Sequence, residues 1–152
     1  MTETDTGTFT VAVFQDVAWA RRAIEALRGH GFAPEHLTVL GKASPELSTL
    51  CEEALGAVPE QLELRALGAA VGRGSLLPVL QGSDKALATL GLGGTFRRAG
   101  FQPHDGHIFE TLAGRGGVLV AVRDERRAAD ALATMHAYGG GNAAIGAWSG
   151  RV

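Results

Sequence analysis

One pattern of apolar and polar positions occurs twice along the chain. VAVFQDVAWARRAIEALRGHG begins at Val11, and VAVRDERRAADALATMHAYG begins at Val120. Each opens with a short β-rich run, reaches an aspartate and continues with apolar residues at helical spacing. When the two aspartates are superposed, the helical positions coincide: Ala20, Ile24 and Leu27 in the first copy, and Ala128, Leu132 and Met135 in the second. The chain is therefore predicted to use one structural unit twice.

Each copy is predicted to be a strand–helix–strand unit. Asp16 and Asp124 are good helix N-caps, and glycines follow both helical stretches, where a left-handed C-cap is favourable. A further candidate strand follows each helix, LTVLG in the first copy and NAAIGAW in the second. A helical crossover makes the two strands of a unit parallel. Two such units in one four-stranded sheet, with both helices on one face, predict an α/β (α+β) fold of the ferredoxin-like sandwich type.

The length of 152 residues fits a single domain over residues 1–152. The polar residues 1–7 are expected to form a flexible tail. The first unit covers residues 9–41 and the second covers residues 117–148. Residues 42–116, between them, are far too long for an ordinary loop and form a Gly/Ala-rich insertion.

The insertion is predicted to be partly helical. Ser44 as N-cap and Pro45 at the first helical position begin one helix. Its apolar stripe comprises Leu47, Leu50, Cys51 and Ala54. The stretch that begins at Pro59 fits a helix or a strand, and we favour a helix. A last helix, with Ile108, Phe109 and Leu112 on its apolar side, leads into the second unit.

Composition places the chain among soluble globular proteins, with 45% hydrophobic and 20% charged residues. The formal net charge of −2 and the few aromatics on the strands argue against nucleic-acid binding. The single cysteine and the polar start of the chain fit a cytoplasmic protein. The longest uncharged piece of the insertion is too short to span a bilayer, which takes about 20 apolar residues. Peripheral membrane association stays open.

The order of these segments resembles a known family. An opening VAVF strand, a helix ending in HGF, an LTVL strand, a Gly/Ala-rich middle and a helix before GGVLVAV follow one another. This order is similar to that of the bacterial general stress protein 17M-like (heat-induced stress protein) domains. The resemblance implies a ferredoxin-like core with a hydrophobic insertion and no enzymatic activity. The middle segment here is shorter and more charged than the family's, and it carries FRRAGFQPHDGH, which has no counterpart in the resemblance.

HDGHIFE holds the residues best suited to a metal. His107 and Glu110 are three residues apart, so they share one face of the predicted helix, and His104 lies just before it. Imidazole and carboxylate ligands at this spacing suit zinc or a similar divalent ion. The alternative, which we favour, is that His104 and Asp105 cap the helix and that the site holds no cofactor. GAAVGRGS, Gly68 to Ser75, has some likeness to a phosphate loop but lacks its Lys-Ser/Thr ending, so its glycines are interpreted as turn and packing positions.

The strands FTVAVF and GVLVAV are apolar on both sides, whereas a sheet with one wet face would alternate apolar and polar residues. Both faces are therefore expected to be covered, the second one either by the insertion or by another subunit. The candidate interface residues are Phe9, Val11, Val13, Leu119 and Ala121. We predict a non-catalytic stress-type or accessory module, not an enzyme, that forms a homo-oligomer or docks onto a larger protein complex. The alternative is a ligand sensor or small metalloprotein that uses the His/Glu site.

Overall fold

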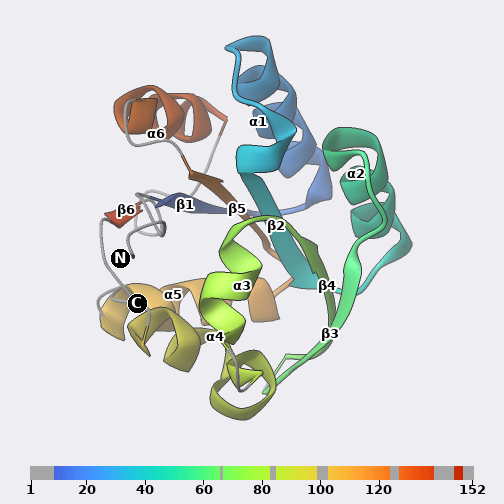
Figure 1. Cartoon of the computed structure of the whole chain (residues 1–152), viewed down its shortest axis with the longest axis vertical. Coiled ribbons are helices and arrows are strands. Elements are labelled where there is room, and N and C mark those ends of the chain that lie inside the picture. The colour runs from blue at the N-terminus through green and yellow to red at the C-terminus, as the bar shows by residue number, and fades with distance from the viewer. Residues whose placement is uncertain are drawn as a thin grey trace.

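The strands of the chain lie in one antiparallel sheet, seen edge-on in Figure 1. The computed structural model describes residues 9–65, 67–82, 85–98, 103–123, 127–138 and 146–148. Within these residues the strand order is β3-β4-β2-β5-β1-β6, and every neighbouring pair is antiparallel. The strands are β1 (Phe9–Phe14), β2 (Leu37–Lys42), β3 (Glu60–Leu64), β4 (Gly68–Arg73), β5 (Val118–Arg123) and β6 (Gly146–Trp148).

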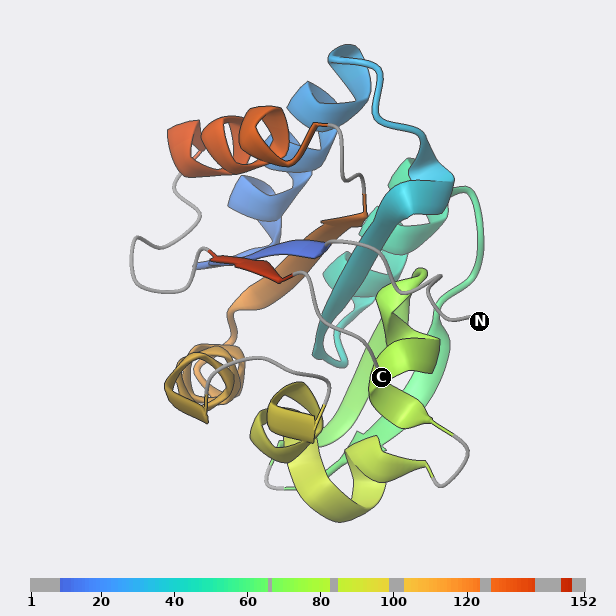
Figure 2. The ribbon, with the colours of Figure 1, turned by 60° about the vertical axis from the view of Figure 1, so that its left-hand side comes forward.

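Helices cover both faces of the sheet, which makes the chain a mixed α+β protein with three layers. One face carries α1 (Val17–Gly29), α2 (Pro45–Leu55) and α6 (Ala128–Ala137). The opposite face carries α3 (Leu76–Gln81), α4 (Ala86–Arg98) and α5 (Pro103–Gly114). Figures 1 and 2 show the two groups of helices on opposite sides of the strands. A 3₁₀ turn, η2 (Pro34–His36), leads from α1 into β2. None of the helices described is both long and apolar enough to cross a membrane.

The two matched sequence patterns begin on neighbouring strands of the sheet. The first strands of the two units, β1 and β5, are neighbours, and Ala12 lies opposite Val120. Strands β1 and β2 are both antiparallel to β5, so they run in the same direction, as a helical crossover requires, with β5 between them. Helices α1 and α6 contact each other on one face. The sheet is larger than the four strands expected, because β3 and β4 extend it beyond β2.

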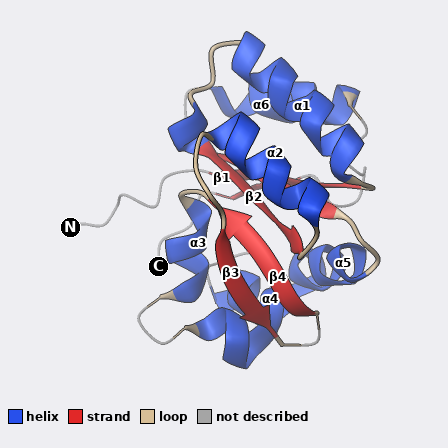
Figure 3. Ribbon diagram, turned by 90° about the vertical axis from the view of Figure 1, so that its right-hand side faces the viewer, coloured by secondary structure: helices blue, strands red, loops and turns tan. Residues whose placement is uncertain are grey.

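The start of the insertion folds as predicted and then departs from the prediction. Ser44 Oγ accepts a hydrogen bond from the Leu47 amide at 3.1 Å, and all four residues of the predicted α2 stripe are buried. The helix favoured after Pro59 is wrong: this stretch forms the β3–β4 hairpin seen in Figure 3. Leu62 and Leu64 turn to the sheet face that α3, α4 and α5 cover, while Gln61 and Glu63, which alternate with them, stay exposed. The apolar residues of this stretch recur at every second position, as in a strand, and not every 3.6 residues, as in a helix.

The second repeat helix is less buried than the first. Ala20, Ile24 and Leu27 are buried in α1 as predicted, and Met135 is buried in α6. The matching positions of Ile24 and Leu132 predict equal burial in the two helices, and this is wrong: Leu132 is only half-buried. The reason is that α1 packs between α2 and α6, whereas among the described residues the main helix contact of α6 is with α1. Helix α6 begins at Ala128 without a side-chain cap, and the predicted cap Asp124 lies outside the described residues, as do residues 1–7 and 142–145.

Candidate functional site

The predicted metal ligands lie on α5, but the described residues do not converge on one point. His107 is exposed, whereas Glu110 is half-buried and faces α4. The backbone of His104 is part of α5, and its side chain lies outside the described residues. Among the residues described, no group of three His, Cys, Asp or Glu side chains is placed to hold an ion. The zinc hypothesis therefore gains no support from the side chains that can be placed.

Glu110 has a structural contact that explains its position. Helix α4 is kinked at Gly91, whose φ of 76° lies in the left-handed region. The amide of Gly93, at the start of the second half of α4, donates to Glu110 Oε2 at 3.4 Å. A Cβ at Gly91 would lie 2.9 Å from the same oxygen. The carboxylate thus caps a broken helix, as an aspartate does at an ordinary helix start.

The five candidate interface residues are on the face that the insertion covers. All are buried in one apolar cluster with side chains of α3, α4 and α5: Phe9, Val11, Val13, Leu119 and Ala121. Of the two covers considered for this face, the chain uses its own insertion. These residues are consequently not at the surface of the single chain, so they offer no interface on it.

A different region gathers polar groups around an open space. A cavity of about 540 Å³ lies where the end of β4 meets η2, β2 and the last turn of α2. Pro34, Leu37 and Leu55 give it an apolar wall. Its size is within the range of about 300–1,000 Å³ that is usual for small-molecule sites. Segments that are up to about 40 residues apart in sequence meet here, so linear inspection of the chain does not bring them together.

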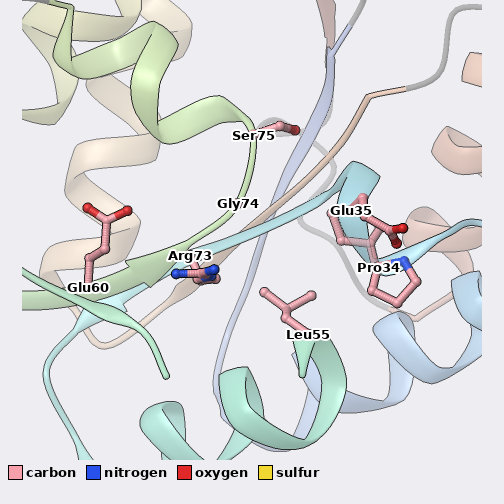
Figure 4. Close-up of a pocket in the computed structure, with 8 residues that line it drawn as sticks. Pro34, Glu35, Leu55, Glu60, Arg73, Gly74 and Ser75 are labelled. Atoms are coloured by element: carbon pink, nitrogen blue, oxygen red, sulfur yellow. The ribbon is translucent and has the colours of Figure 1, made fainter. Parts of the chain in front are cut away.

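Three charged side chains line this cavity. Arg73 comes from the end of β4, Glu60 from the start of β3 and Glu35 from η2. In the view of Figure 4, Glu35 and Pro34 lie on one side of Arg73 and Glu60 lies on the other, with the Glu60 carboxylate turned away from Arg73. All three are exposed, and within the described part of the chain none forms an ion pair or a side-chain hydrogen bond. One positive and two negative groups therefore remain available to a ligand.

Gly74 and Ser75 form the polar end of the cavity. Gly74 has a φ of 135°, and a Cβ there would overlap the Leu37 carbonyl oxygen and Thr38, so only glycine lets β4 turn this close to β2. Thr38 Oγ1 accepts a hydrogen bond from the Leu76 amide at 2.9 Å, which fixes the start of α3. Ser75 Oγ is buried and has no hydrogen-bond partner among the described residues. A buried hydroxyl without a hydrogen bond destabilises the folded state, so its presence needs an explanation.

Cys51 lies on α2, and Arg73 is close enough to influence it. Burial raises the pKa of the Cys51 thiol from 9.0 to about 11, the positive charge of Arg73 lowers it in part, and Glu52 raises it. The thiol is therefore protonated at neutral pH and is a poor nucleophile. This agrees with the interpretation of Cys51 as a small core residue.

A second cavity, also of about 540 Å³, lies between the start of α2 and the β3–β4 hairpin. Of the described residues that line it, only Glu63 is charged, and the others are mainly small or apolar. Its chemistry is therefore less specific than that of the cavity at Arg73. We take the cavity lined by Arg73, Glu35, Glu60 and Ser75, called the Arg73 cavity below, as the candidate functional site.

Sequence reasoning singled out GAAVGRGS but assigned its glycines to turns and packing. That holds for Gly74, whose conformation is a packing requirement. The side chains that accompany it, Arg73 and Ser75, went unassigned because their partners in the cavity are distant in sequence. The only local sign of this site in the sequence is the order Arg-Gly-Ser at residues 73–75. Comparison of the chain with family models, with curated proteins and with solved structures finds no match.

Proposed function

We propose that this chain is a binding module that takes a small molecule with an anionic group in the Arg73 cavity. We further propose that its core is ferredoxin-like, since β2-β5-β1-β6 and the two repeat helices supply the strands and crossovers that such a core needs. Membership in the general stress protein 17M-like family stays a prediction that rests on the order of segments alone.

The observation that carries the proposal is the state of Arg73. Its guanidinium borders a cavity of about 540 Å³ and has no ion pair or hydrogen bond with any described residue. A guanidinium offers five donors in a planar fork that matches carboxylate or phosphate oxygens. Ser75 Oγ is buried and has no hydrogen-bond partner among the described residues. Rotation about χ1 would turn this hydroxyl toward a ligand and give it a partner.

We favour ligand binding over self-association. The sequence suggested self-association because the second face of the sheet needs a cover. The insertion helices α3, α4 and α5 pack on that face. Large exposed apolar side chains among the described residues are limited to Val58 and Leu90, too few for an apolar interface patch. Docking onto a larger complex remains a prediction for which the described residues show no apolar patch, whereas ligand binding has a defined cavity.

The proposal is tested by titrating ¹⁵N-labelled protein separately with sodium propionate, inorganic phosphate and L-leucine while backbone amide shifts are recorded. At least one probe should shift the amides of Gly74 and Ser75 in a saturable way. Arg73→Gln should abolish this response. Arg28→Gln, which removes the same charge from an exposed position at the end of α1, should leave it intact. Shifts that persist in Arg73→Gln, or no response to any probe, would overturn the proposal.

A further inference from the structure

We infer that the ligand of the Arg73 cavity is an amino carboxylate zwitterion with an apolar side chain, such as a free aliphatic amino acid. This inference rests on the proposed function and makes it more specific. The cavity joins one guanidinium, two carboxylates and an apolar wall, and these three features match the carboxylate, the ammonium group and the side chain of such a molecule.

The charges decide between anion classes. A purely anionic ligand at Arg73 would also meet the carboxylates of Glu60 and Glu35, which line the same cavity. For a phosphate, which carries nearly two negative charges at neutral pH, repulsion by two carboxylates offsets attraction by one guanidinium. A carboxylate carries one negative charge and pairs with arginine through two parallel hydrogen bonds. The two glutamates, which repel an anion, would attract an ammonium group on the same molecule and so favour binding.

The geometry is consistent with simultaneous contacts. Arg73 stands between Glu60 and Glu35 in the view of Figure 4, with the Leu55 side chain beside it. Glu60 lies opposite Gly72 and in line with Leu62 and Leu64, so its side chain starts from the sheet face of α3, α4 and α5, whereas Arg73 is on the face of α2. For a ligand whose carboxylate meets Arg73, we take Glu35 of the same cavity as the main partner of the ammonium group and Glu60, at the edge strand, as the second. Pro34 and Leu55, which are half-buried, provide apolar surface for the rest of the molecule. After rotation about χ1, the Ser75 hydroxyl can donate to the ligand carboxylate.

Three probes of one carbon skeleton separate the contributions. L-Leucine carries both charged groups, isocaproate lacks the ammonium group and isoamylamine lacks the carboxylate. We expect L-leucine to bind at least about tenfold more tightly than either, since each charge-assisted hydrogen bond removed costs about 1.5–3 kcal/mol. Amide shifts of Gly74 and Ser75 in the full-length chain report the site, and the titration gives the dissociation constant.

Variants then assign the groups. Arg73→Gln should remove the advantage of L-leucine over isoamylamine, and the double variant Glu35→Gln/Glu60→Gln should remove its advantage over isocaproate. The three side chains are exposed, so the substitutions should leave the fold intact, as the dispersion of the amide spectrum will show. If isocaproate binds as tightly as L-leucine, or phosphate binds more tightly, the zwitterion inference is wrong while the proposed function stands. If none of the probes shifts Gly74 or Ser75, both are wrong.

Discussion

The two faces of the sheet are both covered by three helices among the described residues, but the two covers are built differently. On the face of α1, α2 and α6, side chains do the packing: Ile24, Leu27, Leu50 and Met135 are buried against strand residues such as Val120. On the face of α3, α4 and α5, close backbone approaches at glycines add to the packing of side chains. Gly91 breaks α4 beside Glu110, and a Cβ at Gly117 would lie 2.7 Å from the Leu112 carbonyl oxygen.

This difference shows two ways to close a helix layer over a sheet. Regular amphipathic helices need only a correct apolar stripe. Short or kinked helices need close backbone approaches that glycine permits, and polar caps for the helix ends that each break exposes. The origin of a segment does not decide its face, since α2 belongs to the insertion by sequence yet packs beside α1. The Arg73 cavity lies where α2, η2 and the end of β4 meet.

The largest expected effect tests whether the insertion layer is an integral part of the fold. Phe109 of α5 is 1% exposed and belongs to the cluster under α3, α4 and α5. Phe109→Ala should lower the free energy of unfolding by about 3–5 kcal/mol, measured by urea denaturation. Leu90→Ala, at an exposed position of α4, is the control and should change it by about 0.5 kcal/mol or less. A loss below about 1 kcal/mol for Phe109→Ala would mean that this layer is only loosely attached.

The second prediction compares the two repeat helices. Ile24→Ala should cost about 2–5 kcal/mol, because Ile24 is fully buried between α1 and the sheet. Leu132→Ala, at the matching position of α6, should cost clearly less, about 1 kcal/mol, since Leu132 is half-buried. Chemical denaturation of the two variants under identical conditions gives the comparison. Equal losses would show that α6 is as deeply packed as α1.

The third prediction uses pH to probe α2. The pKa of Cys51 rises from 9.0 to about 11 on folding because the thiol is buried. The unfolded chain therefore loses this proton first, and the folded state loses stability as the pH rises between 9 and 11. The loss should reach about 2–3 kcal/mol relative to Cys51→Ala, in which this titration is absent. Denaturation curves of both proteins across this range are the measurement. Parallel pH profiles would contradict the buried position of the thiol.

The parts of this fold that follow from the sequence are those with a local signal. Ser44 and Pro45 mark the start of α2, and the apolar spacing after them gives its buried side correctly. The matched patterns around Val11 and Val120 place both strands in one sheet. The burial of Leu132 could not be predicted from the sequence, because it depends on how the helices pack around α6. The same holds for the stretch after Pro59, where a short apolar run fits a helix as well as a strand and the pairing partner decides.

The candidate site could not be predicted from the sequence for a related reason. Arg73, Glu35 and Glu60 come from three different elements, and only the fold brings them to one cavity. His104, His107 and Glu110 offered a compact local pattern and therefore attracted the metal hypothesis. Their spacing on α5 is correct, but Glu110 is used at the break in α4. Local spacing shows which residues share a face and leaves open what lies opposite that face.

The smallest effect concerns the contact between α1 and α2 on the side-chain-packed face. Arg21 of α1 forms an ion pair through Nη1 with Glu53 Oε1 of α2 at 2.7 Å. The two side chains are 33% and 59% exposed, so solvent screens the attraction and the pair should contribute only about 0.2–1 kcal/mol. A double-mutant cycle with Arg21→Ala and Glu53→Ala measures this coupling, and added salt should reduce it. A coupling well above this range would make the ion pair, and not Leu50 or Ile24, the dominant link between the two helices. A coupling of zero would show that the ion pair does not contribute to the packing of α1 on α2.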